Sequence, residues 1–205
     1  MRKINSEQIF LGMGITAWII YLLNLFVLAA LTPWYSHMRH QVSDLGRLQA
    51  PHHQIFNSVI ILIGLLYLPT GLGFFYAVKR ITGKKLLAVL IGISVALISV
   101  GAFFAGFYPL PDPLHNGYNI MIIQLFIPLL LVWAFWKVPG TRFFVFYQLT
   151  LFALMLILNR TMTGAFGLVN EMNIGLIQRL FVLSGMFWFT FTCYWLIRYK
   201  SKKFA

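Results

Sequence analysis

The sequence predicts an all-α, polytopic membrane protein, a bundle of six transmembrane helices. Of its 205 residues, 60% are hydrophobic and only 10% are charged, and the mean hydropathy is +0.82. A soluble fold of this composition would lack polar surface, whereas a bilayer accepts apolar faces. The 17% aromatic residues suit the same environment, because aromatic rings favour the borders of a membrane. Membrane lipids are therefore the expected partners.

Six apolar runs approach the roughly 20 residues that cross a ~30 Å hydrocarbon layer. In chain order they cover about 10–31, 54–78, 86–109, 118–136, 143–158 and 176–197. The first follows Arg2 and Lys3 as a signal peptide would, but it exceeds the roughly 7–15 residues of a signal h-region, so we assign it as a helix. The fifth is short and is expected to need a thinned bilayer or snorkelling ends. We expect residues 1–205 to form one domain.

The basic residues are divided unequally between the two sides of this bundle. Of the 16 Lys and Arg residues, all but four lie at the N-terminus, in the second and fourth connections or in the C-terminal tail; the four on the opposite side are Arg39, Arg47, Arg160 and Arg179. The positive-inside rule therefore predicts cytoplasmic N- and C-termini. The same rule accounts for the net charge of +12, so no nucleic acid is expected as a partner. Nothing in the sequence indicates an oligomeric state.

The titratable residues concentrate on the outer side in this topology. It holds all five histidines and three of the four acids, Asp44, Asp112 and Glu171. It also holds the two longest connections, 32–53 and 159–175. Because long loops in compact bundles commonly carry function, we expect any site to lie at the outer membrane surface.

Two helix starts on the outer side share one residue pattern. A Pro is followed by a His two residues on and an Asn six on, in Pro51, His53 and Asn57 and again in Pro113, His115 and Asn119. In an α-helix each His and Asn, at i and i+4, share a face. If the two faces meet, both pairs line one pocket. The alternative is that the histidines are interfacial residues and the asparagines hydrogen-bond between helices.

Imidazole and carboxylate groups on this side suit a divalent metal such as zinc. The candidate ligands are His53, His115 and Asp44, beside a His37-x-x-His40 motif. None of these spacings is diagnostic, so the cofactor is undetermined. Haem is not favoured, because membrane proteins that resemble the b561 cytochromes stack histidine pairs along their helices, and here no histidine lies deeper than a first turn.

Arg179 opens the sixth helix, where an unpaired guanidinium is costly. We expect it to snorkel to the membrane border or to pair with Glu171 or Asp44, or else to bind an anionic headgroup or substrate through planar, bidentate hydrogen bonds.

Four short motifs occur in order on the outer side. They are Ser43-Asp44-Leu45-Gly46, Asn57, Tyr108-Pro109 followed by His115, and Gly175-Leu176-Ile177-Gln178-Arg179. Together they resemble the pattern of the domain-of-unknown-function 998 family over nearly the whole chain. The sequence departs from that pattern at Gln178, where a Glu is expected before the Arg. The resemblance implies a six-helix integral membrane protein and supplies no established reaction.

The residues suggest an outward-facing membrane enzyme, a hydrolase or transferase acting on a lipid or lipid-linked substrate. Histidine suits acid–base catalysis because its pKa lies near neutral pH. The candidate catalytic residues are His53, His115, Asp44 and, as nucleophile, Ser43. The candidate substrate-binding residues are Arg179, Arg39, Asn57, Asn119 and Glu171.

Two other classes of protein fit the same sequence. A transporter or channel usually has broken helices at the bilayer midplane, and Pro69 and Pro128 are the candidate breaks. A non-catalytic lipid-binding accessory subunit is the third class.

The charge distribution makes a topology prediction. Reporter domains fused at Lys84 and at the C-terminus should both score cytoplasmic, and one inserted at Arg47 should score external. An external signal from the C-terminal fusion would contradict the outward placement of every candidate site residue.

Overall fold

The computed structural model describes residues 5–199, with the side chain of Tyr118 excepted. This part of the chain is all-helical, and six helical segments are long and apolar enough to cross a membrane, as predicted. The α-helices are α1 (Ser6–Ala30), α2 (His53–Thr82), α3 (Lys85–Phe107), α4 (Ile127–Phe135), α5 (Arg142–Met162) and α6 (Ile174–Arg198). Two 3-10 helices are η1 (Val42–Gly46) and η2 (Pro113–Leu125), the latter completing the span of α4.

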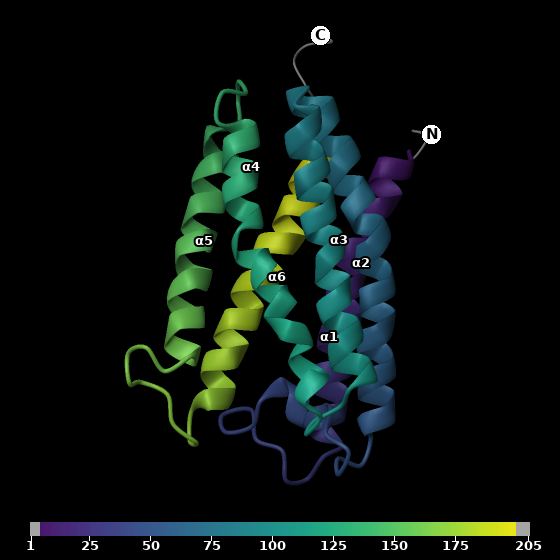
Figure 1. Cartoon of the computed structure of the whole chain (residues 1–205), viewed down its shortest axis with the longest axis vertical. Helices are drawn as coiled ribbons and strands as arrows, with labels where there is room; N and C mark the ends of the chain where they lie inside the picture. Colours follow the sequence, from purple (N-terminus) through teal and green to yellow (C-terminus); the bar gives the residue numbers. More distant parts are fainter. Residues whose placement is uncertain (1–4, 200–205) are drawn as a thin grey trace.

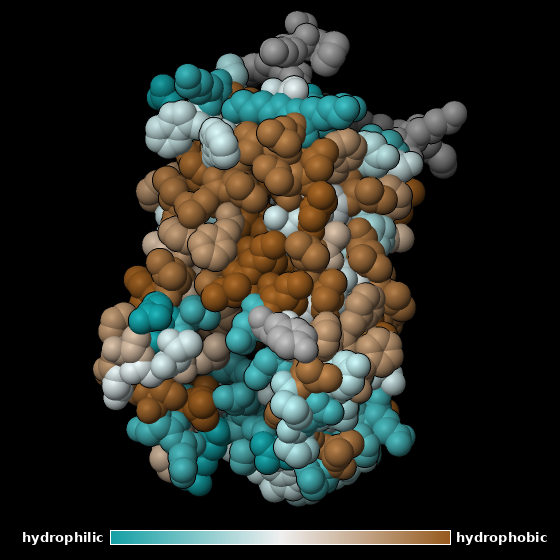
Figure 2. All heavy atoms as spheres, viewed as in Figure 1, coloured by the Kyte–Doolittle hydropathy of each residue, from teal (hydrophilic) through white to brown (hydrophobic). Residues whose placement is uncertain are grey.

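The helices form two groups joined by α6. In Figure 1, α1, α2 and α3 pack together on the right, α4 and α5 lie on the left, and α6 crosses obliquely. The start of α1 and the end of α6 share one end of the bundle, here named the terminal end. The connections 31–52 and 163–173 share the other, here named the loop end. Figure 2 shows a broad hydrophobic belt between two more polar ends. Which end faces the cytoplasm stays a prediction.

The fourth span differs from the continuous helix expected at 118–136. It starts as a 3-10 helix behind Asp112, whose side chain accepts a hydrogen bond from the Leu114 N–H at 2.8 Å. The α-helix begins only at Ile127, with Pro128 in its first turn. Proline lacks an N–H and is best accommodated in the first turn of an α-helix, and Pro128 takes that place in α4, whereas Pro69 lies inside α2 without ending it. The expectation that His115 and Asn119 share an α-helical face is therefore wrong.

Two other spans are longer than predicted. The fifth helix reaches Met162, and its 21 residues are enough to cross the bilayer without thinning it. The second extends past Val78 to Thr82 and ends at Gly83, which has a left-handed φ of 72°. Charged residues occupy these extra turns, which is why hydropathy alone placed the ends too early.

The closest packing lies between α2 and α3. A Cβ on Gly71 would lie 2.5 Å from the backbone oxygen of Gly92, and a Cβ on Gly92 would lie 2.9 Å from that of Gly71. Helix association in a membrane depends on such backbone contact, because apolar side chains gain nothing by leaving lipid for protein.

At the terminal end, basic side chains join helices that are distant in sequence. Arg80 on α2 forms a two-pronged ion pair with the buried Glu7 on α1, at 2.9 and 2.7 Å. It also donates hydrogen bonds to the carbonyls of Leu196 and Tyr199 at the end of α6. The last carbonyls of a helix lack internal partners and attract cations, so Arg80 ties α1, α2 and α6 together.

The α2–α3 contact predicts a destabilising substitution. Gly71→Ala forces two backbones apart and should lower the free energy of unfolding by about 1–3 kcal/mol. Gly12→Ala is the matched control, because no heavy atom lies within 4 Å of its added Cβ and alanine favours helix by about 0.5–1 kcal/mol. Thermal unfolding in detergent compares the two, and equal midpoints would contradict the contact.

Candidate functional site

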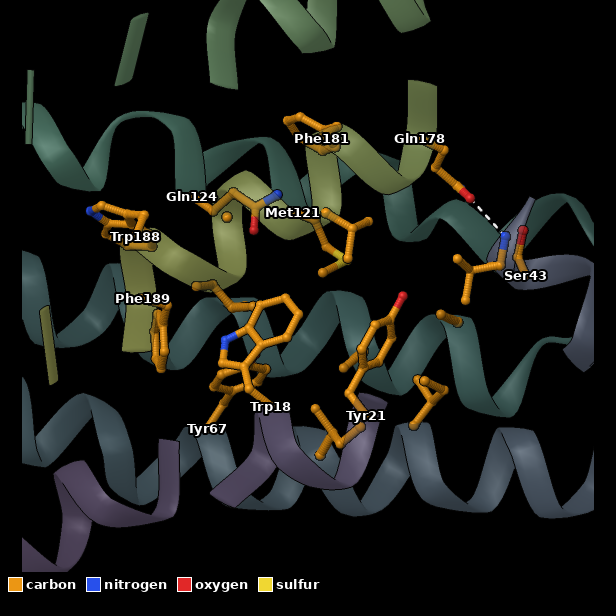
Figure 3. Close-up of a pocket in the computed structure, with 18 of the residues that line it drawn as sticks. Trp18, Tyr21, Ser43, Tyr67, Met121, Gln124, Gln178, Phe181, Trp188 and Phe189 are labelled. Atoms are coloured by element: carbon orange, nitrogen blue, oxygen red, sulfur yellow. Dashed lines mark hydrogen bonds between the residues drawn. The ribbon is translucent and has the colours of Figure 1, made fainter. Parts of the chain in front are cut away.

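A cavity of about 270 Å³ lies between α1, α2, α3, η2 and α6 and extends inward from the loop end. Figure 3 shows Ser43 and Gln178 at one end of this cavity and Trp188 and Phe189 at the other. Gln178 and Trp188 are ten residues apart on α6, so the cavity runs ~15 Å along that helix at 1.5 Å per residue. It therefore reaches about half-way through a ~30 Å hydrocarbon layer.

The cavity wall is mostly apolar and aromatic, with a few neutral polar groups. The aromatic residues Trp18, Tyr67, Trp188 and Phe189 line its deep part. The polar lining residues are Tyr21, Ser43, His115, Gln124 and Gln178. No Lys, Arg, Asp or Glu belongs to the lining among the residues that the structure describes. An apolar pocket with a few placed polar groups is the usual form of a small-molecule site.

His115 is the sole histidine in the described cavity wall. It is 8% exposed, and its Nδ1 lies 2.9 Å from the backbone oxygen of Tyr108. A carbonyl oxygen only accepts hydrogen bonds, so Nδ1 carries the proton and donates it. In the neutral ring, Nε2 then has a free lone pair, as a general base requires.

Ser43 is brought to the cavity by the connection 31–52. It belongs to η1, whose first residue, Val42, donates its backbone N–H to Oε1 of Gln178 at 2.7 Å. Gln178 is the position where the sequence departs from the expected Glu, and its amide oxygen serves here as the acceptor that joins η1 to α6.

Arg179 joins the same connection to α6 through neutral groups. Its Nε donates to Nδ1 of His37 at 3.0 Å, and Nη1 donates to the backbone oxygens of His40 and Gly175 at 2.9 and 2.7 Å. Nη2 donates to the hydroxyl of Tyr35, whose ring lies 5.4 Å from the guanidinium carbon. We name Tyr35, His37, His40 and Arg179 the Arg179 cluster.

The electrostatics of this cluster favour neutral partners for the arginine. Burial raises the pKa of Tyr35 to about 12, although the Arg179 guanidinium opposes this. Tyr35 therefore keeps its proton and donates it to the Gln41 carbonyl at 3.2 Å. Desolvation, and secondly the charge of Arg179, lower the pKa of His37, which keeps Nδ1 free to accept the Nε hydrogen bond.

The expected ion pair of Arg179 with Glu171 or Asp44 is wrong. Within residues 5–199, the ion pairs are Arg47–Asp44 at 2.9 Å and Arg80–Glu7. Asp44 also accepts the Gln41 backbone N–H at 2.8 Å, so it stabilises the start of η1. Glu171 is exposed in the turn before α6. In place of a carboxylate, the guanidinium has two backbone carbonyls, one imidazole and one hydroxyl as acceptors.

The remaining sequence-predicted residues do not gather at the cavity. His53 is held by its own turn, with Nδ1 2.9 Å from the Ala50 oxygen. Asn57 is buried and donates to the Gly46 oxygen at 2.9 Å. Asn119 is exposed and has a left-handed φ of 59°. Arg39 is exposed as well. The pocket predicted from the repeated Pro-His-Asn pattern is therefore reduced to His115.

No group of three His, Cys, Asp or Glu residues in the described part of the chain is close enough to hold a metal ion. His53, His115 and Asp44 have separate partners instead. A zinc site stays a prediction from the sequence.

Sequence reasoning missed the aromatic and amide groups of this site. Tyr21 points its hydroxyl into the cavity from α1 (Figure 3), and within the described residues no hydrogen bond to that hydroxyl occurs. Trp18 and Tyr21 stand at i and i+3, a spacing that places both on one face of α1. This spacing could have indicated a shared site, but aromatic residues that pack in a helix core have the same spacing.

The Arg179 cluster makes a prediction about pH. The pKa of His37 in the folded protein is below the ordinary value of about 6.5, so its stabilising contribution is full above pH ~6.5. It is lost as the pH falls through 6.5 and then through the folded pKa, because protonated Nδ1 cannot accept from Arg179. Hydrogen exchange of residues 35–45 in nanodiscs should therefore accelerate at pH 5.5 relative to pH 7.5, after correction for the intrinsic rate.

The His37→Gln variant is the control for this measurement, because an amide oxygen accepts from Arg179 without titrating. An identical corrected pH response in wild type and variant would rule out His37 as the titrating group.

Comparison with known proteins agrees with the sequence motifs. Residues 15–195 match the family model described as protein of unknown function (DUF998). No curated protein and no solved structure gives a significant match. Since the matched region covers most of the chain and all six membrane-spanning segments enter it, the chain belongs to the DUF998 family of integral membrane proteins.

Proposed function

We propose that this protein binds a lipid, or the chain of a lipid-linked molecule, in the cavity between α1, α2, α3, η2 and α6. The apolar chain lies in the deep aromatic part and the polar head lies near Ser43 and Gln178. With the predicted topology, the ligand enters from the outer leaflet. The observation that carries the proposal is a cavity of about 270 Å³ with an apolar inner part and polar groups toward the loop end.

The length and chemistry of the cavity support this assignment. Its ~15 Å course along α6 follows the direction of lipid chains. An apolar cavity wall contacts a lipid chain much as other lipid chains do, so the chain part of the ligand can lie there without any charged contact. The polar lining residues then fix the orientation of the head.

A hydrolase or transferase reaction is compatible with this binding mode. Of the proposed catalytic residues, Ser43 and His115 line the cavity. Asp44 and His53 lie outside its wall and contact the backbone of Gln41 and Ala50. The catalytic form of the proposal therefore rests on His115 as base and Ser43 as nucleophile.

Transport is the second candidate. The fourth span breaks between η2 and α4, and η2 contributes His115, Met121 and Gln124 to the cavity. Discontinuous helices beside a midplane cavity are typical of transporters. Movement of a labelled lipid between leaflets of a proteoliposome would distinguish transport from static binding.

Filling the cavity tests the binding itself. Ala102 lines the cavity and is 4% exposed, so Ala102→Leu displaces about three methylenes of a bound chain. Forcing a chain past the added side-chain atoms costs about 1–3 kcal/mol, so the affinity for a chain ligand should fall roughly ten-fold or more. Native mass spectrometry of the purified protein measures the bound lipid.

Ala153→Leu is the matched control, because Ala153 is exposed on α5. It should retain the lipid fully. Equal lipid occupancy in wild type, Ala102→Leu and Ala153→Leu, with all three folded, would refute binding in this cavity.

A further inference from the structure

One hydrogen bond fixes the imidazole ring of His115 at the cavity wall. Nδ1 of His115 donates to the Tyr108 carbonyl, so in the neutral ring Nε2 has only a lone pair to offer. No described residue donates to Nε2. Because His115 lines the cavity, a ligand there can supply the hydrogen-bond donor that Nε2 lacks.

The other polar groups of the cavity are uncharged and have spare hydrogen-bonding capacity. The Tyr21 hydroxyl, the Ser43 hydroxyl and the Gln124 amide have no hydrogen bond to any residue that the structure describes. Gln178 uses only its Oε1, for Val42, which leaves its amide N–H groups free. The cavity therefore offers a mixed set of donors and acceptors, with Nε2 of His115 as a fixed acceptor and the Trp18 indole N–H, which has no partner among the described residues, as a fixed donor.

Asp44 and Arg179, the charged residues that follow the cavity-lining Ser43 and Gln178, are committed to protein partners. Asp44 pairs with Arg47. Arg179 directs Nε, both Nη1 hydrogens and one Nη2 hydrogen to protein acceptors, and it does not line the cavity. An anionic head inside would lose its hydration without gaining a cation, and it would face the lone pair of His115.

We propose that the head group of the bound lipid is uncharged and presents a hydrogen-bond donor, a hydroxyl or an amide N–H, to Nε2 of His115. Long-chain alcohols and monoacylglycerols belong to this class. The inference rests on the proposed function, because it assumes that a chain occupies the apolar part of the cavity. It departs from the anionic substrate expected from Arg179 and Arg39.

Three probes with one chain length test the head group. They are hexadecan-1-ol, its methyl ether and hexadecanoate, each titrated onto the full-length protein at pH 8 and measured by native mass spectrometry. The alcohol should bind best. The ether cannot donate a hydrogen bond and should bind roughly ten-fold more weakly than the alcohol, because losing one buried hydrogen bond lowers the affinity by about that factor. Hexadecanoate should bind at least as weakly as the ether.

The variant His115→Phe keeps a ring of similar shape and removes the acceptor, so the alcohol and the ether should bind it equally. His53→Phe is the matched control, since His53 has the same Nδ1-to-carbonyl contact outside the cavity, and it should retain the ten-fold preference. The wild-type probe series decides the question by itself if His115→Phe does not fold.

Equal binding of alcohol and ether to the wild type, or tighter binding of hexadecanoate, would overturn the head-group inference and leave chain binding intact. Failure of all three probes to bind, with no lipid in the purified protein, would overturn the proposed function and this inference together.

Discussion

The arrangement of the loop end depends on how the protein accommodates the Arg179 guanidinium without a carboxylate. Four of its N–H groups reach neutral acceptors, three of them supplied by the connection 31–52. Because a buried donor without an acceptor is costly, these hydrogen bonds hold the connection against the start of α6, where the Leu176 N–H also donates to the Met38 oxygen at 3.1 Å. That position carries η1, and with it Ser43, to the edge of the cavity. The cavity's polar end is thus a consequence of a cation that lies outside its wall.

A cavity with neutral polar groups suits a membrane protein for a general electrostatic reason. A charge deep in the hydrocarbon region costs several kcal/mol unless it is paired, whereas amides and hydroxyls can be satisfied by a ligand or by water. The described charges at the loop end accordingly lie in the connections, in the last turn of α5 and in the second turn of α6, and Gln124 and Tyr21 lie inside. This separation lets one protein hold a lipid chain and a polar head without a permanent charge next to the chain.

Composition and run length predicted the six spans, because lipid imposes one requirement on every helix. The boundaries of α2 and α5 could not be predicted from hydropathy, since their last turns contain Arg80 and Arg160 in positions where helices still form. The break at Pro128 was visible as a residue, but whether proline kinks a helix or starts one depends on the packing around it. The partners of Arg179 come from residues about 140 positions away, and no local pattern reports such contacts. His115 was predicted for its chemistry, while its cavity is formed by residues of seven helical elements that only the fold brings together.

The contacts of Arg80 with α1 and α6 have a consequence for the order in which the helices assemble during synthesis. Glu7 and Arg80 lie on the first two membrane helices, so their ion pair can form as soon as α2 leaves the ribosome, long before α6 exists. The hydrogen bonds from Arg80 to Leu196 and Tyr199 can form only when the last helix has entered the bilayer. The first two helices can thus form a hairpin in which Glu7 and Arg80 neutralise each other while the other four helices are made. The end of α6 then accepts the hydrogen bonds from Arg80. The first half of the same helix completes the cavity wall.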